Sequence, residues 1–449
     1  MSPPDHPLLL TVEKMIYGGD GLAHLPADEK GRGKAVFVPF VLPGEKIEAV
    51  VTEQKSGFAR AKAESIVEPS AHRIEPACPY FGRCGGCHYQ HSSYDHQLEI
   101  KKDILRETLR RTAKLELSVD IQVHASPPWN YRNRSRLQVQ ATPEFKAGYF
   151  KMSSHELLAV ENCPISSKLI NRGIAALWEN GRAGKVPPGV DEVEFFANAD
   201  DSQLLVEVTA NQQSRRSALR SWAEDFRASM PEIAGVVVFR DAEKGDPNAQ
   251  EKLLTVEADH LTYQTARAVY RVSAGSFFQT NRYLTDKLIN IVTEGQTGES
   301  AIDLYAGVGL FSTALGDIRH VVSVESSQTS TADLSYNLPL NAEAVRSTTE
   351  QYLGGDKTRQ SRKGEVLPPV PFRPDLVVVD PPRGGLGERV ARSLVTLGAP
   401  RVVYVSCDPV TLARDLAILL AGGYRIEQVH LFDLFPQTYH LESVVHLAR

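Results

Sequence analysis

The order of apolar and polar positions divides the chain into stretches with different periods. Residues 8–68 contain short segments in which apolar and polar side chains alternate, separated by turns rich in glycine and proline. Such alternation predicts half-buried β-strands, so we expect a small all-β barrel here. Residues 94–111 instead carry apolar side chains at helical spacing, with Ile104, Leu105 and Leu109 on or near one face. This spacing predicts an amphipathic helix.

The remaining sequence separates into two larger regions. Residues 120–265 mix strand-like runs with a helical segment, which predicts a central α+β domain. Beyond about residue 270, strands and helices alternate as they do in a parallel, doubly wound sheet. The predicted fold class is therefore α/β, with a Rossmann-like domain, an N-terminal β-barrel and a central α+β domain. The expected boundaries are 8–68 for the barrel, 69–93 and 115–265 for the central domain, and 94–114 and 266–449 for the Rossmann-like domain.

Length and charge narrow the class of protein. A chain of 449 residues is too long for one ordinary core, so several domains are expected. The net charge of −5 gives no whole-chain signature of nucleic-acid binding, and any such site must come from local basic patches. No apolar run approaches the roughly 20 residues that span a bilayer, and the first seven residues lack the features of a secretory signal. We therefore expect a cytoplasmic protein that does not enter a membrane, and nothing in the sequence indicates more than a monomer.

Five cysteines divide by spacing into a group of four and a single residue. An odd number cannot pair completely, and a reducing cytoplasm disfavours disulfides, which favours ligand and nucleophile roles. The group of four can bind tetrahedral Zn²⁺ or a [4Fe–4S] cluster, since both accept four thiolates. Spacing alone does not choose between them. The four cysteines of this predicted metal site are Cys78, Cys84, Cys87 and Cys163.

A glycine turn follows the first strand of the Rossmann-like region. Residues 301–312 place an apolar strand before Gly307 and Gly309 and then a helix, so that the backbone can approach a ligand at the carboxyl end of the strand. The next strand ends at Glu325, where a carboxylate can bind ribose hydroxyls. These features predict a nucleoside cofactor. S-adenosylmethionine fits better than NAD, because it has no pyrophosphate that requires the fuller glycine pattern.

Two later strand ends carry reactive side chains. Asp380, followed by two prolines and Arg383, and Cys407 both come directly after apolar runs, so both are expected at the edge of the sheet that binds the cofactor. A lone cysteine is most often a buried structural residue, but this position favours a nucleophile. Glu442 at the start of the last strand is then a candidate base. Amino-group methyltransferases commonly have an aromatic residue at the position of Arg383. The arginine therefore weakens the alternative that this protein methylates an exocyclic amine.

Basic residues offer a candidate RNA contact. Arg132, Arg134 and Arg136 alternate along a probable strand and share one face. They could bind phosphates, or they could form a salt-bridged, solvated face. Basic and aromatic side chains of the barrel leave the same two alternatives open, an RNA-binding surface or an ordinary solvated one.

Together these motifs resemble one enzyme family. The chain carries FFQTN at 277–281, the turn at 303–309, DPPR at 380–383, SCDP at 406–409 and HLESV at 440–444, in the order seen in RNA uracil-C5 methyltransferases. The barrel resembles the TRAM domain that many members carry. The likeness covers nearly the whole chain and is weakest over residues 165–260.

The resemblance implies an S-adenosylmethionine-dependent enzyme that forms 5-methyluridine in RNA. It implies that Cys407 adds covalently to C6 of uracil and that Glu442 removes the proton from C5. It also implies a [4Fe–4S] cluster rather than zinc, and 23S ribosomal RNA rather than transfer RNA as the substrate. The implied S-adenosylmethionine-binding residues are Gln279, Tyr305, Glu325 and Asp380.

Two departures and two alternatives accompany the resemblance. Ala306 stands where many relatives have cysteine, and Leu310 replaces a polar residue found in some, so Leu310 cannot offer a side-chain hydrogen bond to the cofactor. A nucleic-acid base N-methyltransferase would share the cofactor fold without needing Cys407. A non-catalytic, cluster-bearing RNA-binding protein would use the fold for binding alone.

Overall fold

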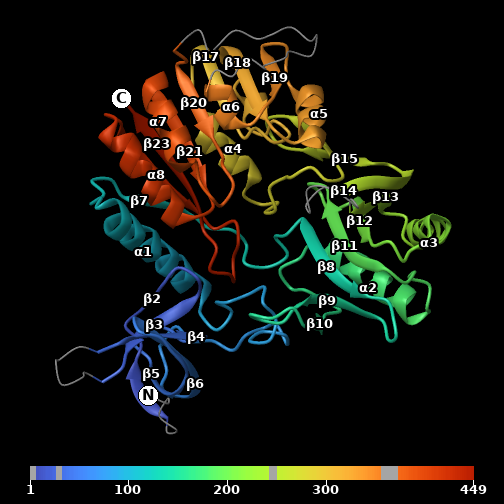
Figure 1. The fold of residues 1–449 in the computed structure, drawn as a ribbon, viewed down its shortest axis with the longest axis horizontal. Coiled ribbons are helices and arrows are strands. Elements are labelled where there is room, and N and C mark those ends of the chain that lie inside the picture. Colours follow the sequence, from blue (N-terminus) through green and yellow to red (C-terminus); the bar gives the residue numbers. More distant parts are fainter. Residues whose placement is uncertain (1–6, 27–32, 242–249, 355–372) are drawn as a thin grey trace.

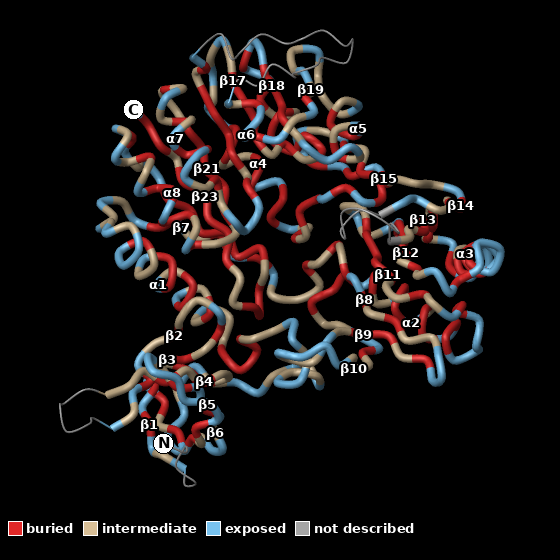
Figure 2. The backbone as a smooth tube through the Cα atoms, in the orientation of Figure 1, coloured by how far each residue is buried: buried red, intermediate tan, exposed pale blue. Residues whose placement is uncertain are grey.

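The computed structural model describes residues 7–26, 33–241, 250–354 and 373–449. The first six residues, which belong to the stretch searched for a secretory signal, lie outside the described residues. Figure 1 shows the N-terminal strands at the lower left, the central domain at the right and the C-terminal α/β region at the top. Buried residues follow the strands and the inner faces of the helices in each region (Figure 2). Among the described residues, no helix is long and apolar enough to cross a membrane.

The N-terminal β domain is built from strands that bury every second residue. β4 and the first part of β5 alternate in this way, and their interior positions include Val36, Val38 and Ile47. This period of two is what a strand with one covered face requires, and the predicted all-β region is confirmed. In the described residues the strand order is β1-β5-β6-β4-β3-β2. The strands are β1 (Leu8–Thr11), β2 (Lys14–Met15), β3 (Asp20–His24), β4 (Ala35–Pro39), β5 (Lys46–Gln54) and β6 (Phe58–Glu68).

The central domain packs helices on a mainly antiparallel sheet. Its described strands run in the order β10-β9-β8-β11-β12-β13-β14, and β12 and β13 are parallel. Phe195 of β11 and Val206 of β12 lie in the same apolar cluster as Leu177 and Trp222 of the helices, which confirms the predicted α+β arrangement. The elements are β8 (Arg134–Gln140), β9 (Lys146–Phe150), β10 (Leu157–Ala159), α2 (Lys168–Arg182), β11 (Val190–Ala197), β12 (Leu204–Ala210), α3 (Arg216–Ser229), β13 (Ile233–Asp241) and β14 (Gln250–Glu257).

The C-terminal region contains the predicted doubly wound sheet. Among the described residues its strand order is β19-β18-β17-β20-β21-β23-β22-β7, and β19, β18, β17, β20 and β21 are parallel. β20 is buried along its whole length, as expected for a strand covered on both faces. The strands are β17 (Gly298–Leu304), β18 (Ile318–Glu325), β19 (Ala342–Arg346), β20 (Leu376–Val379), β21 (Arg401–Ser406), β22 (Arg425–Phe432) and β23 (Glu442–Ala448).

Helices cover both faces of this sheet, and a short hairpin precedes it. The hairpin pairs β15 with β16 in antiparallel fashion. The helices and the hairpin are α4 (Thr285–Thr293), the 3-10 helix η1 (Ser312–Ala314), α5 (Gln328–Asn337), α6 (Thr349–Gly354), α7 (Gly387–Leu397), α8 (Pro409–Ala421), β15 (His260–Gln264) and β16 (Val269–Ser273).

Two early segments belong to the C-terminal sheet. Helix α1 (Tyr94–Ala113) packs against α8, and its Ile104 and Leu105 share an apolar cluster with Leu412. Strand β7 (Ile121–His124) pairs in parallel with β22, although the sequence boundaries place these residues in the central domain. The sequence could not show this pairing, because a strand of four residues carries no local signal of the sheet with which it will pair.

Candidate active site

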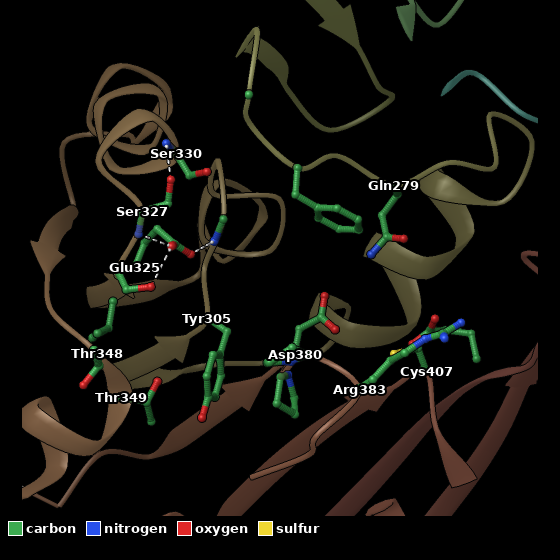
Figure 3. Close-up of a pocket in the computed structure, with 18 of the residues that line it drawn as sticks. Gln279, Tyr305, Glu325, Ser327, Ser330, Thr348, Thr349, Asp380, Arg383 and Cys407 are labelled. Carbon is green, nitrogen blue, oxygen red and sulfur yellow. Dashed lines mark hydrogen bonds between the residues drawn. The ribbon is translucent and has the colours of Figure 1, made fainter. Parts of the chain in front are cut away.

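Parallel strand ends bring the predicted site residues together. Tyr305 follows β17, Glu325 ends β18, Asp380 follows β20 and Cys407 follows β21. Because neighbouring parallel strands end at the same edge of a sheet, these side chains meet there. They line one cavity of about 790 Å³, which Gln279 also lines. Figure 3 shows Glu325 at one end, Cys407 at the other, and Tyr305 and Asp380 between them.

The cofactor end depends on backbone conformations that favour glycine. Gly307 and Gly309 have positive φ angles of 55° and 93°, and a Cβ on Gly309 would lie 2.9 Å from a methyl carbon of Leu334. The Gly307 N–H donates to Glu325 Oε2 at 3.0 Å, and the Ser327 N–H donates to Oε1 at 2.6 Å (Figure 3). These two backbone donors fix the Glu325 carboxylate at the cavity wall.

Hydroxyl-bearing residues line the cofactor end and were not found from the sequence. They lie directly after β18 and β19 or in the first turns of the helices that follow. The sequence signal that could have identified them is a short run of serine and threonine after each of two strand ends. Hydroxyl groups suit a polar ligand, because each can both donate and accept. These residues are Ser326, Ser327, Ser330, Ser347, Thr348 and Thr349.

Two adjacent phenylalanines have different environments. The Phe277 side chain is exposed and lines the cavity. Phe278 is buried, and its ring centroid lies 4.4 Å from that of Tyr263 in the core. Of the pair, only Phe277 is therefore available to stack on a ligand in this cavity.

The pairing register of β21 and β23 places the candidate nucleophile beside the candidate base. Ser406 pairs with Ser443 in antiparallel orientation. Cys407, which follows Ser406, therefore lies beside Glu442, which precedes Ser443, and both residues line the cavity. Asp408 then caps α8, and its Oδ1 accepts from the backbone N–H groups of the first turn at 2.9 and 3.0 Å. Cys407 therefore occupies a strand-to-helix turn with little freedom.

The acidic groups at this end disfavour one another's ionisation. Burial, followed by the charges of Glu442 and Asp380, raises the pKa of Cys407 to about 12, and Arg383 opposes the shift. Burial and Asp380 raise the pKa of Glu442 well above its usual value, and burial together with Asp303 raises the pKa of Asp380 to about 7. Titratable groups perturbed in this way within a cavity are typical of functional sites.

The cavity also contains cationic groups. Arg383 donates to His440 Nδ1 at 3.0 Å, and burial and Arg383 lower the pKa of His440 to about 3, which leaves the imidazole neutral. Of the three arginines predicted to share one face, Arg134 and Arg136 lie in β8 and form ion pairs with Glu194 at 3.1 and 2.9 Å, so the salt-bridged alternative holds for these two. Arg132 instead lines both this cavity and a second one.

The segment that leads into Glu442 is anchored by distant parts of the chain. The Gln437 carbonyl accepts from the N–H groups of His88 and Tyr89 at 2.8 and 2.9 Å. Lys101 of α1 and Asp433 form an ion pair at 2.6 Å with both side chains fully buried. We call residues 433–441 the anchored segment, because the residues after Cys87 and helix α1 together hold it.

The second cavity collects the predicted metal-site cysteines. It has a volume of about 240 Å³, and all four thiols of the group line it without forming a disulfide. Burial raises the pKa of Cys84 to about 11 and that of Cys87 to about 12, and the other cysteines contribute to both shifts. Among the described residues, no group of three or more His, Cys, Asp or Glu side chains is arranged so that it could hold a metal ion. The four residues are Cys78, Cys84, Cys87 and Cys163.

The fold and the strand-end cavity define the class of the protein. The sheet is doubly wound, a glycine turn follows its first strand, and a carboxylate stands at the end of its second strand. This is the architecture of an S-adenosylmethionine-dependent methyltransferase. The family model described as tRNA (Uracil-5-)-methyltransferase matches residues 93–449, and the TRAM domain model matches residues 8–63. The chain therefore belongs to the family of RNA uracil-C5 methyltransferases and carries an N-terminal TRAM domain.

Individual relatives agree with this assignment along the whole chain. An uncharacterized RNA methyltransferase of Aquifex aeolicus is 34% identical over 98% of both chains. One from Streptomyces coelicolor is 34% identical over 96% of this chain and 91% of its own length. The crystal structure of a Pyrococcus abyssi tRNA (uracil-54, C5)-methyltransferase in complex with S-adenosyl-L-homocysteine has the same fold, with a TM-score of 0.74 and 23% identity over 98% of this chain and 100% of that one.

Proposed function

We propose that the protein forms 5-methyluridine in RNA through a covalent bond between Cys407 Sγ and C6 of the target uracil. The observation that carries the proposal is the meeting of Cys407, Glu442 and Asp380 in one cavity with the carboxylate of Glu325 at its other end. The cavity, about 790 Å³, has room for the methyl donor at the Glu325 end and for an extruded base beside the thiol.

The chemistry requires a thiol because C5 of uracil is a poor nucleophile. Addition of the Cys407 thiolate to C6 converts the ring to an enolate, and C5 then attacks the methyl carbon of S-adenosylmethionine. The S–CH₃ bond breaks, and its electron pair stays on sulfur to give S-adenosylhomocysteine. Glu442 removes the proton from C5, the C5=C6 double bond re-forms, and Cys407 leaves as the thiolate.

Charge regulates when this chemistry can start. With its pKa raised to about 12, Cys407 is a protonated thiol at neutral pH in the free protein. Arg383 favours the thiolate, and the positive sulfonium of the methyl donor favours the ionised forms of acidic groups beside it. Binding of the cationic methyl donor should therefore lower the pKa of the Cys407 thiol and of the Glu442 carboxyl.

We assign the binding of S-adenosylmethionine to four residues on separate elements. Glu325, whose carboxylate is fixed by two backbone N–H groups, binds the ribose hydroxyls. Tyr305 and Asp380 lie beside it at the ends of β17 and β20, and Gln279 faces them across the cavity (Figure 3). Phe277, exposed at the same cavity, stacks on the extruded base or on the adenine.

The substrate we favour is 23S ribosomal RNA. The support is the combination of a TRAM domain with four clustered cysteines, by analogy with family members that carry both. Transfer RNA is the alternative, and the solved Pyrococcus abyssi relative is named for it. Arg383 after the two prolines weighs against base N-methylation. Mapping 5-methyluridine in ribosomal and transfer RNA from cells lacking this protein decides between the two substrates.

We propose that Cys78, Cys84, Cys87 and Cys163 bind a [4Fe–4S] cluster. The four thiols line one cavity and none of them forms a disulfide, and four thiolates are the ligand set of a [4Fe–4S] cluster. Zinc accepts the same four ligands, and the family resemblance favours the cluster. Metal analysis after anaerobic purification tests the assignment: iron with sulfide supports it, and stoichiometric zinc contradicts it.

A mechanism-based trap tests the central proposal. RNA that carries 5-fluorouridine at the target should form a stable protein–RNA adduct in the presence of S-adenosylmethionine, because fluorine at C5 cannot leave as a proton does. Denaturing gel electrophoresis detects the adduct. An active enzyme that forms no adduct contradicts covalent addition by Cys407. The domain boundaries, the cytoplasmic location and the monomeric state expected from the sequence stay predictions.

A further inference from the structure

One turn of the TRAM domain reaches the candidate nucleophile. The turn joins β2 to β3, and the Ile16 N–H donates to the Asp20 carbonyl at 2.9 Å while the Gly19 N–H donates to the Ile16 carbonyl at 3.2 Å. Gly18 and Gly19 have φ angles of +113° and +96°, which favour glycine. This tight turn presents Tyr17 toward the methyltransferase domain.

Tyr17 contacts the backbone of Cys407 and the anchored segment that precedes Glu442. Its hydroxyl donates to the backbone carbonyl of Cys407 at 3.4 Å, a long hydrogen bond of the kind that often tightens when substrate binds. Its ring packs edge-on against Tyr439 of the anchored segment, with centroids 5.6 Å apart and planes at 87°. The TRAM domain therefore contacts both the turn that holds Cys407 and the segment that leads to Glu442.

The same turn also contacts the residues that follow the cysteine group. A Cβ on Gly19 would lie 3.2 Å from the side chain of His88, so any larger residue there would have to displace His88 or the turn. His88 in turn packs against Tyr439, with ring centroids 4.6 Å apart. Tyr17, Tyr439 and His88 thus form a continuous contact between the TRAM domain, the anchored segment and the cysteine-bearing segment.

The TRAM domain is packed firmly enough to hold Tyr17 in place. Met15 and Leu42 are buried in the apolar cluster that contains Leu105 of α1. Lys14 also forms an ion pair with Glu107 of α1 at 2.7 Å, and Figure 1 shows β2 beside this helix. Burial, followed by the charge of Asp408, raises the pKa of Tyr17 well above its usual value, so the phenol stays a hydrogen-bond donor across the working pH range.

We propose that Tyr17 is a positioning residue for Cys407, and that the TRAM domain thereby contributes to the chemical step as well as to RNA binding. This inference rests on the proposed function, because it assumes that Cys407 is the nucleophile. The sulfur must approach C6 within about 3.5 Å and along the right direction, and a misplacement of about 1 Å can cost about 100-fold in rate. A hydrogen bond to the carbonyl of the nucleophile itself restricts that placement.

A domain that only recruits RNA would behave differently. Loss of a recruiting contact raises the RNA concentration needed for half-maximal rate and leaves the maximal rate unchanged. Loss of a positioning contact lowers the maximal rate and leaves the RNA requirement and the affinity for the methyl donor unchanged. The two roles are therefore separated by kinetics at saturating RNA.

The test uses the full-length protein and the substitution Tyr17→Phe, which removes the hydroxyl and keeps the ring. Adduct formation is timed with S-adenosylmethionine and with 23S ribosomal RNA and transfer RNA transcripts containing 5-fluorouridine, in separate reactions. We expect the maximal rate of adduct formation to fall about tenfold, with half-saturation and S-adenosylhomocysteine binding within about twofold of the wild type. Gly19→Ala leaves Tyr17 intact but pushes the turn away from His88. It should also lower the maximal rate of adduct formation.

A matched control separates positioning from general stability. Tyr424 also donates its hydroxyl to a backbone carbonyl, that of Ala399, at 2.8 Å, and it precedes β22 away from the cavity. Tyr424→Phe should leave the adduct rate within twofold of the wild type. An unchanged maximal rate in Tyr17→Phe, or a change confined to half-saturation, overturns the inference. If the wild type itself forms no adduct with either RNA, the proposed function fails instead.

Discussion

The two cavities are organised by different parts of the fold. The catalytic cavity takes its reactive groups from the ends of adjacent strands, which the hydrogen-bonded sheet fixes in place. The cysteine-lined cavity takes its thiols from turns at residues 78–87 and from the irregular segment around Cys163. The sheet therefore fixes the first cavity, whereas turns and irregular segments hold the four cysteines of the second.

The cavities are nevertheless connected. Arg132 lines both, and the backbone of Gln437 in the anchored segment is held by the residues directly after Cys87. A disturbance of the cysteine-lined cavity should therefore reach Glu442 through the anchored segment, whereas a change at Cys407 should leave the cysteine-lined cavity intact. Substitutions in each cavity, with the effect measured in the other, test this asymmetry.

The largest effect is expected from Cys407→Ala. Without the thiol, C5 of uracil is not activated, so methyl transfer should fall by more than about 10⁴-fold and the 5-fluorouridine adduct should disappear. Binding of S-adenosylhomocysteine, measured by calorimetry, should stay within about twofold, and the metal content should not change. A variant that keeps full methyl transfer would instead indicate a base N-methyltransferase, which needs no thiol.

Glu442→Gln should stall the reaction after methyl transfer. The amide cannot accept the C5 proton, so turnover should fall by about 10²–10⁴-fold, and a covalent protein–RNA complex that already carries the methyl group should accumulate. A labelled methyl donor and denaturing gel electrophoresis detect this complex. Glu427→Gln, at a carboxylate of the same sheet paired with Arg425 on the surface, is the matched control. Normal turnover in Glu442→Gln would assign the base to another residue.

Cys84→Ser tests the dependence of one cavity on the other. We expect loss of bound iron, a lower melting temperature, and an adduct rate reduced about tenfold, because the segment that anchors Gln437 is no longer held. The comparison with Cys407→Ala, which should keep its iron, separates the two cavities. If Cys84→Ser loses iron and keeps the full adduct rate, the cavities are independent and the anchored segment is held without the cysteines.

The sequence predicted the features that depend on local pattern. Strand ends can be recognised from apolar runs, and parallel strands must end together, so Glu325, Asp380 and Cys407 could be placed at one edge without a structure. The contacts of Tyr17 and Gln437 could not be predicted, because they join residues hundreds of positions apart and leave no periodic signal. The pairing of β7 with β22 could not be predicted for the same reason, since strand pairing is decided by the tertiary fold.

The smallest expected effect concerns the charge crowded into the catalytic cavity. Asp303 is buried and Asp380 is half-buried, and desolvation raises the pKa of each carboxyl to about 7, from an ordinary value of 3.8. A carboxyl whose folded-state pKa is raised binds more protons in the folded state than in the unfolded state. The stability it contributes is therefore complete below about pH 4 and is lost as pH rises through about 7.

Asp380→Asn removes one of these two carboxyls, so the free energy of unfolding of the ligand-free protein at pH 8 should rise by about 1 kcal/mol. The gain should shrink toward zero as pH falls to about 4, because the wild-type carboxyl is then neutral in both states. Melting temperatures at pH 5 and pH 8 measure this difference, with Glu427→Gln as a surface control that should show no such trend. The same variant should lose affinity for S-adenosylmethionine, because Asp380 is one of the residues to which we assign cofactor binding. A gain in stability that does not depend on pH would mean that Asp380 destabilises the fold through its shape rather than its charge.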